Sequence, residues 1–479
     1  PIRMFENESI SCLYLDSNSC LWIGSKSKQI HRVLSNGEVK HVLLKMTDDF
    51  SYIDSDIYCF REDSNGNIWV GTLSGLYLLE IKGDKGEVVQ VEKPLLPEST
   101  IFSLYSDNQG TLWIGSYYGE VRFFNTKTNY YSFLPSNDRV SANLHGAVIG
   151  SMTEDLNGSL YIATEGSGLN VIHKNSALVE HFKKGTNGLT HNKIRSVWFD
   201  KENNRLYLGV YMDGLSYLDL KSQKFHTIKS PILSSIHEKI VEEIISYKNY
   251  LILLTQDGIF KMDKESQLIT PLFDEVKLQN ECKGIIRVIH VDNRGILWVS
   301  SMTKGLFTVD LKNKRILRNY GSGLGQGSVI PSAVRAICGN QKDGLFFATL
   351  KSGLLEYDFD KDTFKSYTKE NHMLLSDVCY NMEFTKNGKL ILTSDKGISL
   401  LDVRKHSSKH IRLTDFLPLK ALSGDCGLFV SPTSGKIYVG GIYGMMSFME
   451  DDLNDEQNDY NLYFSSLSVN NKMIDPSAD

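Results

Sequence analysis

Ile68-Trp69-Val70-Gly71-Thr72 is one copy of a short sequence that recurs along the chain. Three clear further copies are Leu21-Trp22-Ile23-Gly24-Ser25, Leu112-Trp113-Ile114-Gly115-Ser116 and Leu297-Trp298-Val299-Ser300-Ser301. Weaker copies complete a series of ten, with central positions Trp22, Trp69, Trp113, Tyr161, Tyr207, Ile252, Trp298, Phe346, Ile391 and Tyr438. Successive positions are 44 to 48 residues apart, the length of one four-stranded propeller blade. The repeat therefore predicts an all-β propeller of ten units.

Each unit predicts strands joined by tight turns. In the copy at 57–79, alternation indicates an inner strand at 57–61, and the sequence from Asp63 to Gly66 is typical of a turn. A second strand follows at 68–72 and a third at 76–79. The residue two places after the central aromatic is small in most units. We therefore expect each tryptophan to be buried where its ring fills a gap in the next blade.

Composition excludes several classes of protein. The formal net charge of −5, from 52 basic and 57 acidic residues, argues against nucleic acid as a partner. No apolar run approaches the roughly 18 residues that span a bilayer, and no signal peptide begins the chain. The sequence is therefore expected to be cytosolic or a trimmed piece of an exported protein.

The seven cysteines and the remaining motifs indicate no metal or cofactor. The chain has no Cys-x-x-Cys pair, so a structural zinc site is not expected. Cys12 and Cys59 occupy the same place in adjacent units, which is too far apart for a disulfide in stacked sheets. We expect the thiols to be free and buried.

The repeats resemble those of a known family of sensors. Their pattern, Ile-x-x-Ile-x-x-Asp-x-x-Gly-x-Leu-Trp-Ile-Gly-Thr-x-x-Gly-Leu, is similar to the propeller repeats of the periplasmic sensor region in hybrid two-component systems of the glycan-sensing type. In that family two seven-bladed propellers precede an immunoglobulin-like domain, a transmembrane helix, a histidine kinase and a DNA-binding regulator. The segment from Phe464 to Met473 resembles the first strand of the immunoglobulin-like domain.

The resemblance implies a division of the chain into three parts. Residues 1–139 would be the last three blades of an N-terminal propeller, residues 140–455 a complete seven-bladed ring, and residues 456–479 the start of the immunoglobulin-like domain. The residues themselves leave two alternatives open, a single ten-bladed ring and seven blades followed by three. The sequence contains no clear linker that decides between them.

Candidate binding residues fall on one face of the predicted propeller. The loops after the second strands combine aromatic, acidic and basic residues that suit sugar recognition, namely Tyr211, Asp213, Lys304, Lys351 and Tyr443. Three arginines share the second position of the inner strand in different units, namely Arg195, Arg287 and Arg335. They are expected to converge at one mouth of the central channel. There they either bind a carboxylate or sulfate, or staple the blades by bonding backbone carbonyls or an acid such as Glu242 or Glu243.

The resemblance implies a periplasmic, ligand-binding sensor region of an inner-membrane protein. Its ligand would be an oligosaccharide, possibly acidic, and it would signal to a histidine kinase elsewhere in a homodimeric receptor. Attachment to the membrane would come only through segments beyond the C-terminal end. No catalytic residues, metal or cofactor are expected in this region. Two other classes stay open: a propeller enzyme such as a sialidase-like hydrolase or polysaccharide lyase, and a protein-interaction scaffold.

Overall fold

The structure is a computed structural model and consists almost entirely of antiparallel β-sheets. It describes residues 8–26, 29–42, 55–63, 66–82, 87–90, 96, 99–108, 110–117, 121–125, 131–138, 140–174, 176, 178–236, 239–273, 286–302, 305–321, 333–413, 419, 421–453, 467–469 and 472–474. Within these ranges, no helix has both the length and the apolar character needed to cross a membrane.

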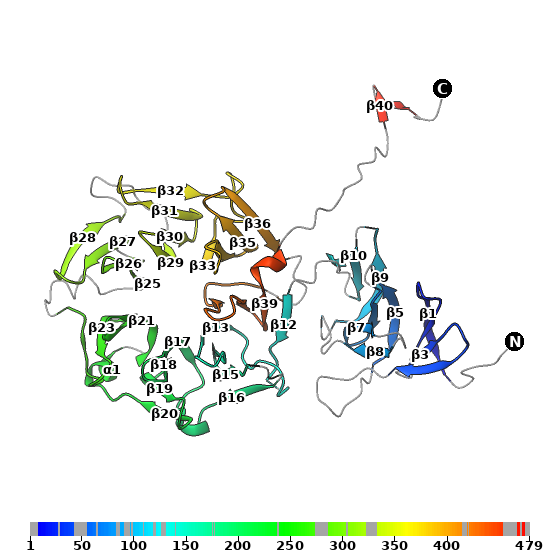
Figure 1. The fold of residues 1–479 in the computed structure, drawn as a ribbon, viewed down its shortest axis with the longest axis horizontal. Helices are drawn as coiled ribbons and strands as arrows, with labels where there is room; N and C mark the ends of the chain where they lie inside the picture. Colours follow the sequence, from blue (N-terminus) through cyan, green and yellow to red (C-terminus); the bar gives the residue numbers. More distant parts are fainter. Residues whose placement is uncertain are drawn as a thin grey trace.

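The N-terminal part is an arc of three sheets (Figure 1). Its inner strands are in contact in the order β1, β5, β9. The strands are β1 (Ile10–Leu15), β2 (Leu21–Ser25), β3 (Ile30–Val33), β4 (Val39–Val42), β5 (Ile57–Glu62), β6 (Ile68–Thr72), β7 (Gly75–Lys82), β8 (Glu87–Gln90), β9 (Ile101–Ser106), β10 (Thr111–Ser116) and β11 (Val121–Asn125).

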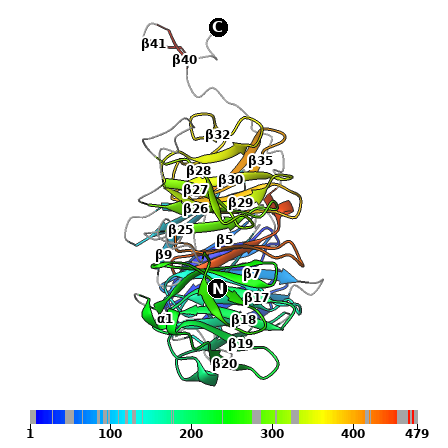
Figure 2. The same cartoon turned by 90° about the vertical axis from the view of Figure 1, so that its left-hand side faces the viewer.

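The rest of the chain up to residue 453 forms a ring of seven four-stranded sheets (Figure 1). Figure 2 shows these sheets stacked when the ring is viewed from its side. The first three sheets contain β13 (Ile149–Glu154), β14 (Leu160–Thr164), β15 (Gly168–Ile172), β16 (Val179–Phe182), β17 (Ile194–Asp200), β18 (Arg205–Val210), β19 (Gly214–Asp219), β20 (Lys224–Thr227), β21 (Val241–Tyr247), β22 (Tyr250–Thr255), β23 (Gly258–Asp263) and β24 (Ile269–Pro271).

The fourth to sixth sheets repeat this plan. They contain β25 (Ile286–Val291), β26 (Ile296–Ser301), β27 (Gly305–Asp310), β28 (Arg315–Asn319), β29 (Val334–Asn340), β30 (Gly344–Thr349), β31 (Leu354–Asp358), β32 (Thr363–Tyr367), β33 (Cys379–Phe384), β34 (Leu390–Ser394), β35 (Gly397–Asp402) and β36 (Ser407–Arg412). The short helical elements of the described chain are η2 (Thr186–Gly188), α1 (Pro231–Ser235) and η5 (Glu450–Leu453), and a last hairpin pairs β40 (Leu467–Val469) with β41 (Lys472–Ile474).

The seventh sheet takes its outer strand from upstream of the ring. It holds β37 (Leu428–Val430), β38 (Ile437–Gly441) and β39 (Gly444–Phe448), and β12 (Tyr131–Pro135) pairs with β39. The inner strands contact one another around the ring, and β37 contacts β13 to close it. The predicted all-β propeller class is confirmed. The expected boundary at 139/140 needs correction, because it would separate β12 from the sheet that it completes.

A buried pairing of tryptophan with aspartate explains the repeated sequence. The indole Nε1 of Trp69 donates a hydrogen bond of 2.9 Å to Asp63, the first residue of the turn between β5 and β6. Trp22 and Trp298 make the same bond to the aspartate six residues earlier. The three rings are buried, as predicted. A Cβ at Gly71 would lie 2.5 Å from the Cys59 Sγ, which is why this position is small.

Trp113 departs from the prediction that every repeat tryptophan is buried. Its indole also bonds an aspartate, Asp107, at 3.0 Å, but the residue is 39% exposed. It lies in the last sheet of the arc, where no further sheet of the described chain packs on it. Tyr105 and Phe123, which pair with Trp113 on the same face of this sheet, are exposed as well. This sheet therefore presents an apolar face that its counterparts in the ring bury.

The described cysteines are free, as expected, although Cys12 and Cys59 are only partly buried. Burial raises the pKa of the Cys59 thiol to about 12, so this thiol stays protonated at neutral pH.

Candidate functional site

A β-bulge positions the three arginines at the channel mouth. In β17 the pairing with β18 passes from Ile194 to Ser196, which leaves Arg195 as the extra, unpaired residue. The same shift in β25 and β29 leaves Arg287 and Arg335 unpaired, and in β21 it leaves Glu242 unpaired. A bulge bends the strand and re-aims the side chain of its extra residue. The four residues are therefore placed equivalently on four neighbouring inner strands.

Arg195 is held between two carboxylates from different sheets. Its Nε donates to Glu242 at 2.8 Å, and one terminal nitrogen donates to Asp425 Oδ1 at 2.8 Å. Burial by itself would lower the pKa of Arg195, but the hydrogen bonds and the charges of Asp425 and Glu242 outweigh it and raise this pKa. The predicted hydrogen bond from Arg195 to an acid of the next blade, Glu242, is confirmed. Glu243, the second expected partner, instead accepts a hydrogen bond from the backbone N–H of Ile289.

Arg335 also reaches the segment that precedes β37. It donates to the carbonyl oxygen of Gly424 at 2.7 Å and lies 3.8 Å from Asp425. A Cβ at Gly424 would collide with its guanidinium group. Burial lowers the pKa of Arg335, and the positive charges of Arg287 and Arg195 act in the same direction. Arg195 and Arg335 therefore both tie residues 424–425 of the seventh sheet to other parts of the ring.

Arg287 differs from the other two arginines. Its side chain is exposed, and it influences the pKa of both Arg335 and Asp425 through its charge. Among the residues that the structure describes, no hydrogen bond or ion pair within 4 Å holds its guanidinium group. Arg287 is therefore the arginine of the mouth that is open to a ligand.

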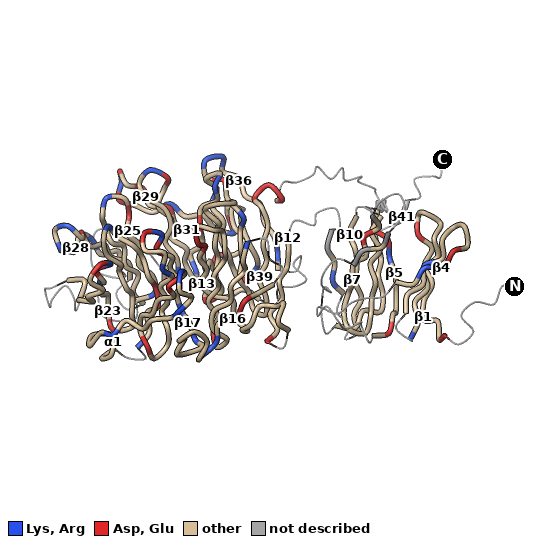
Figure 3. Tube along the Cα trace, turned by 60° about the horizontal axis from the view of Figure 1, so that its bottom comes forward, with Lys and Arg blue, Asp and Glu red and all other residues tan. Residues whose placement is uncertain are grey.

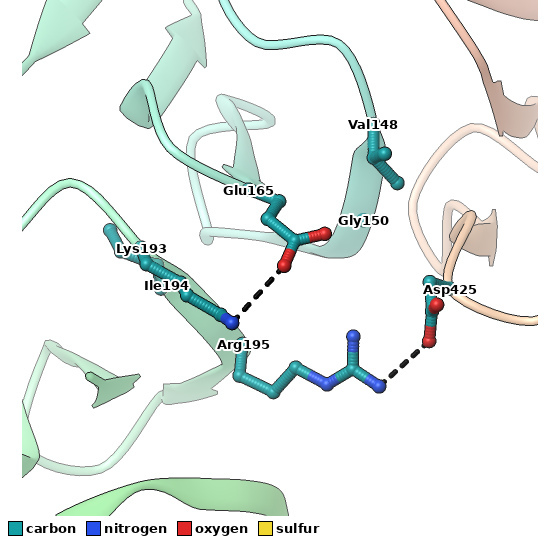
Figure 4. A pocket seen from close by; sticks show the side chains of 7 residues that line it. All are labelled: Val148, Gly150, Glu165, Lys193, Ile194, Arg195 and Asp425. Atoms are coloured by element: carbon teal, nitrogen blue, oxygen red, sulfur yellow. Dashed lines mark hydrogen bonds and ion pairs between the residues drawn. The ribbon is translucent and has the colours of Figure 1, made fainter. Parts of the chain in front are cut away.

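A small hollow opens beside Arg195 (Figure 4). It holds about 290 Å³ of empty space, part of it open solvent, and is lined by Val148, Gly150, Glu165, Lys193, Ile194, Arg195 and Asp425. Lys193 and Glu165 form an ion pair of 3.1 Å on one side. The cavity itself is only about 20 Å³, about the space of one water molecule and far below the range for small-molecule sites, about 300–1,000 Å³. The hollow fits one chemical group of a larger ligand rather than the whole ligand.

Aromatic residues lie around this hollow. Lys193 Nζ lies 5.2 Å from the ring centre of Tyr211, which also contacts His191. Tyr443 is 49% exposed, and its backbone N–H donates to Ala147, the neighbour of Val148. Tyr443 and Met212 have φ of 64°, in the left-handed region that disfavours bulky residues. Such strained, exposed loop residues are concentrated at functional surfaces.

Two of the remaining predicted residues, Asp213 and Lys351, belong to the described part of the chain. Asp213 accepts hydrogen bonds from Thr190 and Thr227, and Thr227 ends the outermost strand of its sheet, β20. Lys351 is exposed in the loop after β30. Lys304 lies outside the described residues. The mouth group of the predicted set is therefore formed by the arginines with Tyr211 and Tyr443.

Sequence reasoning did not find Asp425 or Lys193, and it placed Glu165 only among the exposed loop residues of this face. Asp425 lies in the segment Gly424–Gly427, whose composition is typical of a turn, so it carried no sign of an ionic role. With these residues, the mouth contains four positive groups (Lys193, Arg195, Arg287 and Arg335) and three negative ones (Glu165, Glu242 and Asp425). This small positive excess contrasts with the rest of the molecule, where basic and acidic residues are interspersed (Figure 3).

Comparison with known proteins identifies one matching family and several solved structures with a similar fold. Residues 4–27, 51–74 and 95–118 match the two component regulator propeller family. A search of curated proteins found no match. The extracellular domain of a hybrid two-component system from B. thetaiotaomicron is similar, with 20% identity and a TM-score of 0.63 over 92% of this chain and 56% of that one. The extracellular domain of a second system from the same organism, named in one structure as a one-component system and in another as a hybrid two-component system, has 18% identity and a TM-score of 0.56, over 99% and 63% of the two chains. This chain thus spans less than two thirds of either domain.

Proposed function

We propose that this chain, which carries two component regulator propeller repeats, is the ligand-binding part of a sensor in a hybrid two-component system. The repeats matched in its N-terminal part are the observation that carries this proposal. The fold, shared over nearly the whole chain with extracellular domains of such systems, supports it. The region lies in the periplasm, belongs to a homodimeric inner-membrane receptor and signals to a histidine kinase in other parts of that receptor. It recognises its ligand without catalysing a reaction.

We further propose the arrangement of the flanking parts. The arc is the end of a preceding propeller, whose other blades cover the apolar face that includes Trp113 and Phe123. The hairpin of β40 and β41 begins an immunoglobulin-like domain.

The ligand is an oligosaccharide with an acidic group, bound at the channel mouth. Its carboxylate or sulfate contacts Arg287, which has no ionic partner among the described residues, and competes with Asp425 for Arg195. Tyr211 and Tyr443 offer aromatic surface to the apolar faces of the sugar rings. Release of Asp425 from Arg195 loosens residues 424–425, which Arg335 still holds through Gly424 and which lead directly into β37 of the closing sheet. Binding therefore changes the sheet from which the chain leaves the ring.

Calorimetry with acidic and neutral oligosaccharides tests this proposal. Galacturonate oligomers and their neutral counterparts are titrated into the protein at low and at physiological salt. Binding of an acidic oligomer should weaken as salt is added, because exposed charges are screened over about 8–10 Å. Arg287→Lys should weaken it about tenfold, because the fork of the guanidinium group is lost while the charge remains. Arg404→Ala, at an exposed position in the turn after β35, is the matched control.

Two results would contradict the proposal. Tight binding of a neutral glycan that neither salt nor Arg287→Lys affects would move the site away from the arginines. Release of reducing sugar during the titration would show an enzyme instead of a sensor.

A further inference from the structure

A second pocket lies between the fourth and fifth sheets of the ring. It holds about 500 Å³ of empty space, part of it open solvent, and shares no residue with the channel mouth. Its lining comes from the strands and turns of two sheets: Arg294, Ile296, Trp298, Thr308, Leu317, Arg318, Tyr320, Tyr357 and Asp362. The cavity itself is about 210 Å³, below the range of about 300–1,000 Å³ for drug-sized ligands, so it is limited to a small ligand.

Aromatic rings form the inner wall of this pocket. Trp298 and Tyr320 are stacked, with ring centres 5.9 Å apart and planes inclined by 11°. Tyr357 meets the edge of Trp298, with ring centres 5.0 Å apart. Leu317, 40% exposed on β28, adds an apolar surface at the opening. Such a wall suits a ring that has an apolar face.

Hydrogen bonds hold the polar side of the pocket in place. Asp362 Oδ1 accepts from the hydroxyl groups of Tyr320 at 2.8 Å and Tyr357 at 2.6 Å. The other oxygen of Asp362 forms an ion pair with Arg318. Because both tyrosine hydroxyls and the carboxylate are bonded to one another, the wall is pre-organised and needs little ordering when a ligand binds.

The charges of the pocket balance one another. Arg318 is paired with Asp362, and Arg294 is paired with Asp292 at 2.6 Å. Two positive groups thus face two negative ones, so the pocket offers no net attraction to an anion. The side chain of Arg318 is nevertheless 55% exposed, and a guanidinium group has more N–H donors than one ion pair uses. The pocket can therefore donate to ligand oxygens, and Asp362 can accept from a hydroxyl group.

We infer that this pocket binds a neutral sugar residue of monosaccharide size. Its hydroxyl groups bond Arg318 and Asp362, and its apolar face packs on Tyr357 and Leu317. The inference does not rest on the proposed function of the channel mouth, because the two sites share no residue and differ in charge. It adds a site for neutral sugar to a ring whose mouth favours an acidic group.

Titration of the whole chain with glucose, galactose and mannose tests the inference, with glucuronate as the charged counterpart. Calorimetry should show saturable binding of at least one neutral hexose at millimolar concentration, accompanied by a change in tryptophan fluorescence because Trp298 lines the pocket. Arg318→Ala should weaken binding about tenfold, as expected for loss of a charge-assisted hydrogen bond. Arg315→Ala is the matched control, since Arg315 is exposed on the same strand and does not line the pocket.

A second variant keeps the test decisive if Arg318→Ala unfolds the pocket. Leu317→Trp adds bulk at the opening from an exposed strand and should also weaken binding at least tenfold, whereas Arg404→Ala, at an exposed position that lines neither pocket, should leave it unchanged. Absence of saturable binding for all three hexoses would overturn the inference. Tighter binding of glucuronate than of glucose, or equal loss in Arg318→Ala and Arg315→Ala, would also overturn it.

Discussion

Glu243 and Glu383 are two carboxyl groups whose ionisation we expect to oppose folding of the ring. Each lies on an inner strand and accepts a hydrogen bond from the next sheet, Glu243 from Ile289 N–H at 3.1 Å and Glu383 from Val430 N–H at 2.8 Å. Burial raises the pKa of both groups to about 7, and the single N–H donor offsets only part of that rise. The ordinary value is 4.5.

The direction of the pH effect follows from these values. Between pH 4.5 and 7 the unfolded chain ionises these glutamates while the folded ring keeps their protons, so the free energy of unfolding falls as the pH rises. The slope is about 1.4 kcal/mol per pH unit for each group, or about 3 kcal/mol per group over this window. Both side chains retain some exposed surface, so these figures are upper limits. Above pH 7 the free energy of unfolding has fallen by the full amount, and below pH 4.5 these two groups do not lower it.

Urea unfolding of the ring, residues 131–453, measures this effect. The transition is followed by the fluorescence of Trp198 and Trp298 at half-unit steps from pH 4.5 to 7.5. Glu243→Gln and Glu383→Gln should each flatten the dependence on pH, because an amide cannot ionise, whereas Glu265→Gln at an exposed position should not. The slope is the decisive quantity, since an imperfect amide hydrogen bond shifts stability equally at every pH. Equal slopes in the wild type and both variants would refute the reasoning.

Two further outcomes concern the closing strand and the tryptophans. A fragment of residues 131–453 should unfold in one cooperative transition, whereas 140–453, which lacks β12, should aggregate or unfold at a lower urea concentration; equal midpoints would show that β12 is dispensable. Trp69→Ala should destabilise the arc by about 3–5 kcal/mol, as loss of a fully buried aromatic does. Trp113→Ala should cost less than half as much because its ring is partly exposed, and equal thermal shifts for the two variants would contradict this.

The repeat predicted the positions of the first three strands of a unit better than that of the fourth, outermost strand, and the reason is physical. The aspartate of the first turn, the tryptophan and the small residue act together in one unit, because Asp63 bonds Trp69 and Gly71 leaves room for Cys59. These constraints are local and recur in the units that carry the aspartate and the tryptophan. The fourth strand has no such constraint. Residues 131–135 have the composition of any outer strand, and nothing in them indicates that their partner is β39, more than 300 residues later.

The candidate site was predictable only in part for a similar reason. The shared repeat position of Arg195, Arg287 and Arg335 was visible because each belongs to the periodic inner strand. Their bulge was not visible, since one extra residue in a strand leaves the repeat length within its normal variation. Asp425 was missed because its contact with Arg195 joins residues 230 positions apart, and no local pattern encodes such a distance.

The closing sheet has a mechanical consequence. Tyr131 at the start of β12 pairs with Phe448 at the end of β39, so the chain enters and leaves the ring at the same end of one antiparallel pair. A force that pulls the two flanking segments apart would therefore break the hydrogen bonds of this pair one after another, starting at Tyr131 and Phe448. It would not load all of the bonds at once. Beyond β39, Glu450 pairs with Lys389 and the Leu453 carbonyl accepts from Lys409, so the sixth sheet would share the load at the exit. Within this ring, the pair of β12 and β39 is the place where a pull from outside would yield first.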